Sequence, residues 1–434
     1  MSRFLIISSR TLSHSAGLAN DMAKGLCDAG HNVDFLTLGC FAKEGEKLYG
    51  GGRIILSDAV PGEIPYTWWE RRYNRMVRNL YKLRYKVTKT QNLHYPNEWL
   101  PMVPPADITK CIDADYDAVI TLFWEDMLNT TSLREIYKRL RCSILIFSPD
   151  MAPMTGGCFY FEDCERFKQG CGNCPRIGYG ILNDATRLNF RIKRRNYARM
   201  KAVFMGNTWM ICQALDSSLF TADTVSNAGI VVNEDVFAPA DDRCVKVGEK
   251  NKFTILLRST PEPRKGNDAM LAAICGFKAM LTAEQAASVE VVTIGDGYFE
   301  DIAKGRLDGV RNIGFVDTAG LVDCYRKADL FLSLSLADAG PSMINQAMLC
   351  GCPVVAFDNG AAMDLVENGI TGYKSTQGDV QDISAKLYAM FISDDANEEM
   401  RRNCRAAAMK VNSIGAFAES VERALRLVNK EVKK

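Results

Sequence analysis

The chain has 434 residues, a length typical of two or three domains. Its composition, 47% hydrophobic and 24% charged, is that of a globular protein and excludes a disordered, collagen-like or coiled-coil chain. The charges nearly cancel, with 53 Lys and Arg against 52 Asp and Glu, so the whole molecule has no field that would hold a nucleic-acid backbone. We therefore expect no nucleic-acid partner, and an electrostatic ligand must be bound by a local patch.

Signals for export and membrane insertion are weak in this sequence. Near the N-terminus the uninterrupted apolar run covers only Phe4 to Ile7, which is too short for a signal-peptide core. No later stretch approaches the 18 or more apolar residues that a spanning helix needs. We expect a cytoplasmic protein.

The first half of the chain has the pattern of a strand-helix-strand unit. An extended apolar run over 4–8 is followed by a polar loop that contains Gly17, a helical pattern over 18–29 and an alternating strand over 33–38. Such a unit requires a parallel sheet with helices on its faces. Further elements are predicted as strands over 118–123, 143–147 and 202–205 and a helix over 184–200.

The second half repeats this scheme with short apolar runs typical of parallel strands buried on both faces. The predicted strands are 253–258, 289–294, 330–334 and 354–357, and the predicted helices are 268–281, 321–327, 343–350, 380–390 and the amphipathic 416–432. The fold class is therefore α/β, with two Rossmann-like, doubly wound parallel-sheet domains that face a central cleft. Ligands of open α/β sheets bind at the carboxyl ends of the strands.

The most informative stretch covers residues 330–357. A buried strand ends at Leu334, a polar turn carries Asp338, and a helix follows in which Gln346 lies about one turn from the start. The first turn of a helix presents free N–H groups and a partial positive charge, so it can hold a phosphate or a hydroxyl-rich ligand. The donor-binding candidates at this turn are Gly340, Pro341, Ser342 and Met343.

Cations and glycines follow two other strands of this half. Arg258 ends one strand, and the loop after it delivers Arg264 and Lys265 immediately before a helix; Gly295 and Gly297 flank Asp296 after the next strand. Each hydrogen bond from a cation to a diphosphate contributes roughly 1.5–3 kcal/mol. The alternative interpretations are a solvated helix start for the cations, a simple turn at Gly297 and, for Asp338, a helix N-cap of about 1 kcal/mol.

Taken together, these motifs resemble glycosyltransferase family 4, the retaining nucleotide-sugar-dependent enzymes of the GT-B fold, in its bacterial surface-polysaccharide type. The motifs of the second half are RKG at 264–266, GDG at 295–297, GFV at 314–316, the block 330–357 and ENGITGY at 367–373. Those of the first half are the loop-helix-strand segment at 18–37, FMGNTWM at 204–210 and SSLF at 217–220. The resemblance covers nearly the whole chain.

The resemblance implies three parts of the chain with different tasks. Residues 1–235 would form the acceptor-side domain, 236–410 the domain that binds the nucleotide sugar, and 411–434 a helix that crosses back to the first domain. The implied activity is that of a hexosyltransferase-type enzyme. It transfers a sugar with retention from a nucleoside-diphosphate sugar to a hydroxyl of a glycan or lipid-linked acceptor, without a catalytic metal ion or other cofactor.

The resemblance also assigns roles to single residues. Asp338 would contact the hydroxyls of the donor sugar and Gln346 the ribose, although the family pattern has a second acidic residue where this chain has Gln346. Lys265, together with Arg258 or Arg264, would hold the diphosphate, and the base would lie near Phe315. On the acceptor side the candidates are Gly17, His14 and Asp150. Related members often carry His where this chain has Pro149 and Phe159, so no histidine role transfers.

A cluster of cysteines distinguishes residues 148–175. Cys158, Cys164, Cys171 and Cys174 follow the spacing C-x5-C-x6-C-x2-C, which is near that of a tetrahedral thiolate zinc site. A structural zinc ion, two local disulfides and four free thiols are all compatible with the spacing. The same insert, TGGC through CGNCP, occurs in a polysaccharide-building subset of the family.

A basic stretch over 68–89 holds eight Lys or Arg against one Glu, interleaved with aromatic residues and Leu. This composition suits an amphipathic helix on an anionic membrane surface, which predicts peripheral association with the inner face of the membrane. A solvated helix face with its apolar side packed inward is an equal alternative.

Two rival functions are compatible with the sequence. One is a GT-B nucleotide-sugar epimerase, for which no catalytic base can be placed. The other is a catalytically weakened subunit that binds a sugar or a partner, which Gln346 and the missing histidines would favour.

Overall fold

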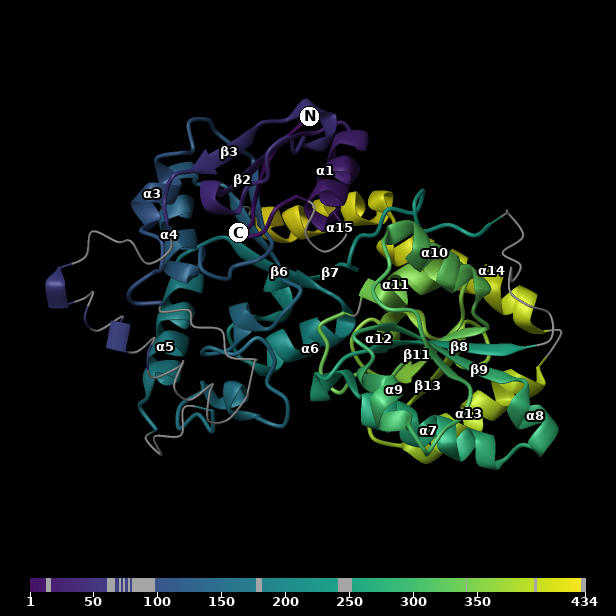
Figure 1. Cartoon of the computed structure of the whole chain (residues 1–434). Coiled ribbons are helices and arrows are strands. Elements are labelled where there is room, and N and C mark those ends of the chain that lie inside the picture. Colours follow the sequence, from purple (N-terminus) through teal and green to yellow (C-terminus); the bar gives the residue numbers. More distant parts are fainter. Residues whose placement is uncertain are drawn as a thin grey trace. The chain divides into compact units, whose positions relative to one another are not determined.

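The chain forms two compact α/β units in the computed structural model (Figure 1). The first unit comprises residues 1–206, 210–228 and 417–434, and the second comprises 207–209 and 229–416. The structure describes residues 1–12, 17–60, 67–69, 72, 75–76, 79, 98–176, 182–240, 252–340, 342–393 and 396–430. Among these residues, none of the helices is both long and apolar enough to span a membrane.

The first unit is built on a parallel sheet of seven strands in the order β3-β2-β1-β4-β5-β6-β7. The strands are β1 (Arg3–Ile7), β2 (Asn32–Leu38), β3 (Ile54–Ser57), β4 (Ala118–Thr121), β5 (Ser143–Phe147), β6 (Ala202–Gly206) and β7 (Val225–Asn227). The central strands β1, β4 and β5 are buried along nearly their whole length because helices cover both faces of a parallel sheet. Phe4 of β1, for example, pairs with Val33 on one side and Ala118 on the other.

The helices of the first unit pack one face on its sheet, and two of them, α4 and α5, begin with a side-chain cap. They are α1 (Leu18–Asp28), α3 (Pro105–Thr109), α4 (Thr130–Leu140), α5 (Ala185–Tyr197), α6 (Thr208–Asp216) and α15 (Ile414–Lys430). The first residues of α6 and α15, 208–209 and 414–416, belong to the second unit. The Asp184 carboxylate caps α5 by accepting bonds from two N–H groups of its first turn. In α15, drawn in yellow in Figure 1, Phe417 packs edge-to-face on Phe147 of β5 with 5.9 Å between ring centroids.

The second unit has a parallel sheet of six strands in the order β10-β9-β8-β11-β12-β13. The strands are β8 (Phe253–Ser259), β9 (Val289–Gly295), β10 (Val310–Asn312), β11 (Leu330–Ser333), β12 (Val354–Phe357) and β13 (Gly372–Ser375). Because the order reverses at β8, the neighbours β8 and β11 form the topological switch point of the sheet. This is where open α/β sheets leave a crevice for a ligand.

The helices of the second unit lie in two layers around this sheet. They are α7 (Asn267–Ala279), α8 (Ala283–Ala287), α9 (Tyr298–Ala303), α10 (Thr318–Lys327), α11 (Ser342–Leu349), α12 (Ala362–Leu365), α13 (Val380–Ile392) and α14 (Ala396–Asn412). One layer contains α7, α9 and α13, and the other contains α10, α11 and α14 (Figure 1). Two doubly wound parallel sheets confirm the α/β class predicted from the apolar runs.

Candidate functional site

A tight turn after β8 places two cations beside the residues that follow β11. Arg264 and Lys265 lie in a short 3-10 turn (Pro263–Lys265), directly before α7. The backbone of this turn is tied to the loop after β11, because the N–H of Leu336 donates to the Arg264 carbonyl at 2.7 Å. The switch point of the sheet therefore brings together chain segments about 70 residues apart.

Asp338 in the loop after β11 is the acid that these cations surround. Lys265 Nζ forms a hydrogen-bonded ion pair with Asp338 Oδ2, and Arg264 Nη1 lies 3.7 Å from the same oxygen. The Asp338 side chain is 5% exposed and the two cationic side chains are 14% exposed, so water screens this cluster little. The family resemblance assigned Lys265 and Asp338 to different parts of the donor, whereas here they contact each other.

The charges of this cluster favour an additional anion. Arg258, near the end of β8, is exposed, and Glu262 lies 2.7 Å from Arg264 Nη2. Burial lowers the pKa of Lys265, the attraction of Asp338 opposes this shift, and the nearby charges of Arg264 and Arg258 lower the pKa further. A group with two or three negative oxygens would relieve the repulsion among these cations.

The helix α11 begins immediately after this loop and carries Gln346. Ser342 and Met343 are half-buried in its first turn, and Pro341 lies outside the described residues. Gln346 is 5% exposed, and its Oε1 accepts a bond of 3.4 Å from the hydroxyl of Tyr325 in α10. Gln346 is therefore held by a tyrosine that the sequence did not identify as part of the site.

The loop after β9 closes against the end of β8. Asp296, between Gly295 and Gly297, accepts a bond from the Ser259 hydroxyl at 3.1 Å and one from the N–H of Tyr298 at 3.1 Å. Gly297 has a positive φ of 84° at the start of α9. Phe315, in the loop after β10, is 82% exposed, so its ring is available to a planar ligand.

The acceptor-side candidates lie in the first unit. Gly17 precedes α1 with a φ of 90°, and His14 falls outside the described residues. Asp150 follows β5, and one oxygen of its carboxylate accepts a 2.7 Å bond from the N–H of Ala152. Burial raises the pKa of Asp150 to about 6. A role of these residues toward an acceptor stays a prediction.

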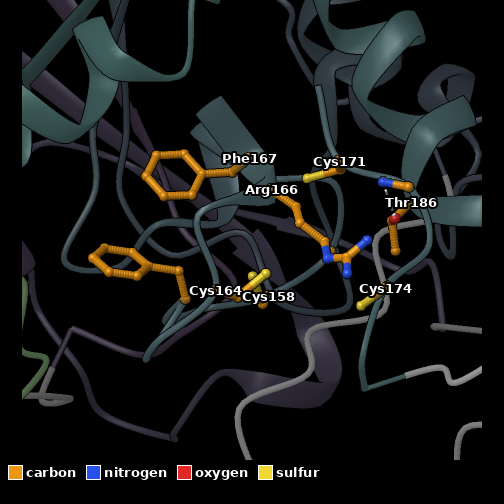
Figure 2. A pocket seen from close by; sticks show the side chains of 10 residues that line it. Cys158, Cys164, Arg166, Phe167, Cys171, Cys174 and Thr186 are labelled. Carbon is orange, nitrogen blue, oxygen red and sulfur yellow. Dashed lines mark hydrogen bonds between the residues drawn. The ribbon is translucent and has the colours of Figure 1, made fainter. Parts of the chain in front are cut away.

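The four cysteines of the insert line one pocket, which Figure 2 shows with Arg166 and Phe167 beside them. All four are free thiols. Burial raises the pKa of Cys158 to about 11 and that of Cys171 to about 12, and Cys171 Sγ accepts a bond of 3.2 Å from the N–H of Gly156. Within the described residues, no three Cys, His, Asp or Glu side chains are placed to hold one metal ion. The arrangement therefore does not fit a zinc ion as it stands, and zinc binding stays a prediction.

A buried ion pair beneath the cysteine loop was not anticipated from the sequence. Lys193 of α5 is fully buried, with Nζ 3.6 Å from Glu98 Oε1 and hydrogen-bonded to the carbonyls of Ala152 and Thr155. Glu98 Oε2 accepts bonds from the N–H and hydroxyl of Thr130. Burial raises the pKa of Glu98 and lowers that of Lys193, and the attraction between them opposes both shifts. The only sequence signal is that Lys193 lies on the same helical face as Asn189 and Asn196.

Comparison with known protein families identifies a domain within the second unit. Residues 252–392, from the residue before β8 to the end of α13, match the family Glycosyl transferases group 1. The chain therefore contains a glycosyl transferases group 1 domain, and this domain includes Arg258, Lys265, Asp338 and Gln346.

Curated relatives match parts of the chain. Phosphatidyl-myo-inositol mannosyltransferase of Mycobacterium leprae is 28% identical over 151 residues, which cover 34% of this chain and 39% of that protein. The putative colanic acid biosynthesis glycosyl transferase WcaC of Escherichia coli is 22% identical over 224 residues, 49% of this chain and 51% of WcaC. The chain thus spans about half or less of the length of these two relatives.

Solved structures match over nearly the whole chain. Sucrose-phosphate synthase of Thermosynechococcus elongatus superposes with a TM-score of 0.63 at 14% identity, covering 99% of this chain and 100% of that one. HepE of Anabaena, solved with UDP and glucose, superposes with a TM-score of 0.61 at 15% identity, covering 98% and 100%. At this identity the likeness concerns the fold alone, and the predicted GT-B fold is confirmed.

Proposed function

We propose that this protein is a glycosyltransferase of family 4. It transfers a sugar from a nucleoside-diphosphate sugar to a hydroxyl of a glycan or a lipid-linked acceptor in polysaccharide or glycoconjugate biosynthesis. The observation that carries this proposal is the pairing of Arg264 and Lys265 with Asp338, with the charge of Arg258 nearby, at the switch point of a group 1 domain. The relative WcaC, described as a colanic acid biosynthesis glycosyl transferase, supports the biosynthetic context.

The cationic cluster supplies what a departing diphosphate needs. Lys265 exchanges its bond with Asp338 for a phosphate oxygen, and Arg258 or Arg264 contacts the other phosphate. As the bond between the anomeric carbon and the phosphate oxygen breaks, negative charge grows on the diphosphate, and these cations and the N–H groups at the start of α11 stabilise it. We propose that they take the place of a divalent metal ion in this reaction.

The exchange at Lys265 also frees Asp338 for the donor. A carboxylate that accepts bonds from sugar hydroxyls orients the ring while Gln346 contacts the ribose. The acceptor hydroxyl attacks the anomeric carbon from the face that the diphosphate leaves and gives its proton to the departing phosphate oxygen. The product then has the same anomeric configuration as the donor.

The basic stretch over 68–89 is the proposed contact with a membrane. Most of the stretch lies outside the described residues, but Trp68 and Trp69 are 59% and 71% exposed, and the Arg72 guanidinium lies 5.5 Å from the Trp68 ring centroid. Exposed tryptophans beside cations suit the interface of an anionic bilayer. We propose a cytoplasmic protein at the inner face of the membrane, which sedimentation with anionic and neutral vesicles tests.

Incubation with a panel of UDP-, GDP- and ADP-sugars tests the activity. The proposal expects release of one nucleoside diphosphate, unchanged by EDTA, and an acceptor product with the anomeric configuration of the donor by NMR. Interconversion of sugars would instead show an epimerase, and binding without turnover a weakened subunit. If EDTA abolished the release of nucleoside diphosphate, only the proposed metal independence would be overturned, and the proposed sugar transfer would stand.

A further inference from the structure

Asn207 joins the loop that carries Asp338 to a distant part of the chain. Asn207 Nδ2 donates to the Ala339 carbonyl at 2.6 Å, across 132 residues of sequence. Its backbone is anchored as well, because the N–H of the next residue, Thr208, donates to the Asp364 carboxylate at 2.9 Å. All of these residues belong to the second unit.

The loop is held on both sides of Asp338. On one side Arg264 Nη1 donates to the Ala337 carbonyl at 3.3 Å, and on the other Asn207 holds Ala339. Gly340 lies so close to this support that an added Cβ would be 3.1 Å from Asn207 Nδ2 and 2.7 Å from Ile230 Cδ1. Two side-chain hydrogen bonds to the flanking carbonyls therefore hold the backbone at Asp338, in addition to the bond from the Leu336 N–H to the Arg264 carbonyl.

The packing around Asn207 leaves a small cavity. A cavity of about 10 Å³ lies beside Asn207 and is also lined by Ile230, Asn345, Asp364 and Asn412. A cavity of this size holds about one water molecule. Packing on this side of Asn207 is therefore incomplete, which leaves the hydrogen bond to Ala339 as a direct polar contact that supports the loop.

We propose that Asn207 is a positioning residue for Asp338 in the donor site. Its amide fixes the loop so that Asp338 lies within reach of Lys265 in the free protein and of the donor sugar in the complex. The second half of this inference rests on the proposed glycosyltransferase function, whereas the first half concerns the protein without ligand.

Two variants test the inference in the full chain. In Asn207→Ala the donor of the bond is lost, and in Asn207→Asp an ionised carboxylate faces the Ala339 carbonyl. Asn189→Ala is the matched control: Asn189 is equally buried, at 5% exposure, and donates to the Gly156 carbonyl at 3.2 Å, but it lies in the first unit.

Hydrogen exchange in the ligand-free protein is the first readout. The amides of residues 335–340 should exchange at least about tenfold faster in both Asn207 variants and at the wild-type rate in the control. Unchanged exchange would overturn the inference whether or not the protein is a glycosyltransferase.

Kinetics with the sugar donor that the wild type uses best are the second readout. We expect kcat to fall at least tenfold in both variants, while the Kd for the free nucleoside diphosphate changes less than threefold. In Asn207→Asp, kcat relative to wild type should recover as pH falls, because a protonated carboxyl donates to Ala339 again. The positioning role would be overturned if kcat and the affinity for the nucleoside diphosphate fell equally. It would also be overturned if kcat of Asn207→Asp did not recover at low pH. A wild type without turnover but with faster exchange in the variants would contradict only the proposed function.

Discussion

Replacing Lys265 by Met tests the central interaction of the donor site. A hydrogen bond from a charged group contributes roughly 1.5–3 kcal/mol, or about 10- to 100-fold in affinity. Because Lys265 already bonds Asp338 in the free protein, ligand binding exchanges one partner for another. We therefore expect the lower end of this range, about tenfold weaker binding of a nucleoside diphosphate by K265M.

Isothermal titration calorimetry with UDP, GDP and ADP measures this effect. Lys386→Met is the control, because Lys386 is similarly buried, at 17% exposure, and forms an ion pair with Asp382 in the same unit. Burial lowers the pKa of Lys265 below that of an ordinary lysine. The affinity of the wild type for a nucleoside diphosphate should therefore fall as the pH rises through this lowered pKa, because the lysine loses its charge. K265M should lack this decline. If K265M bound UDP, GDP and ADP as tightly as the wild type does, the proposed diphosphate site would be refuted.

Three further outcomes follow from the first unit. Lys193→Met should lower the free energy of unfolding by about 3–5 kcal/mol in urea titrations, because it leaves Glu98 buried without its counter-charge; the added change Glu98→Gln should recover part of this loss. Because folding raises the pKa of Asp150 to about 6, stability should fall as pH rises from about 4 to 6, and Asp150→Asn should remove that decline. At pH 8 Cys171, with a pKa of about 12, should react with iodoacetamide at least about a hundredfold more slowly than the exposed Cys212, as mass spectrometry of labelled peptides would measure.

Much of the sheet structure could be predicted from the sequence. The strands β8, β9, β11 and β12 are buried on both faces and therefore appear as apolar runs bounded by loop residues. The predicted helix over 343–350 differs from α11 by one residue at each end. In contrast, the edge strand β10 has only three residues, of which Arg311 is exposed, so no apolar run marked it.

The helix α14 was not predicted because its buried stripe contains few large apolar residues. Met400, Cys404 and Ala408 repeat every four residues and are buried, but Cys and Ala give a weak hydrophobic signal. Arg401, 2% exposed, donates to the carbonyls of Gly351 and Ala328. A charged residue that is buried against helix ends has the same sequence pattern as a solvated one.

Side-chain pairing was the least predictable feature of the candidate site. The sequence indicated that Lys265 and Asp338 each follow a strand of the second half, yet nothing in it showed that they bond each other or that Asn207 supports the loop. Tyr325 lies within the predicted helix over 321–327, and nothing in the sequence marked it as a partner of Gln346. Such contacts join segments far apart in the chain, and a single sequence contains no periodicity that reports them.

Close approach of backbones requires glycine at two positions of the predicted motifs, Gly266 and Gly295. Gly266, with φ of 70°, ends the turn of Arg264 and Lys265, and a Cβ there would overlap the Leu334 carbonyl after β11. Gly295, with φ of 130°, would overlap the Ser259 carbonyl at the end of β8. Since only glycine permits both the positive φ and the approach, these two residues let the loops after β8, β9 and β11 converge. The close approach of these backbones brings the cations within reach of Asp338. A larger residue at position 266 should therefore move Lys265 away from Asp338, even though no charge is altered.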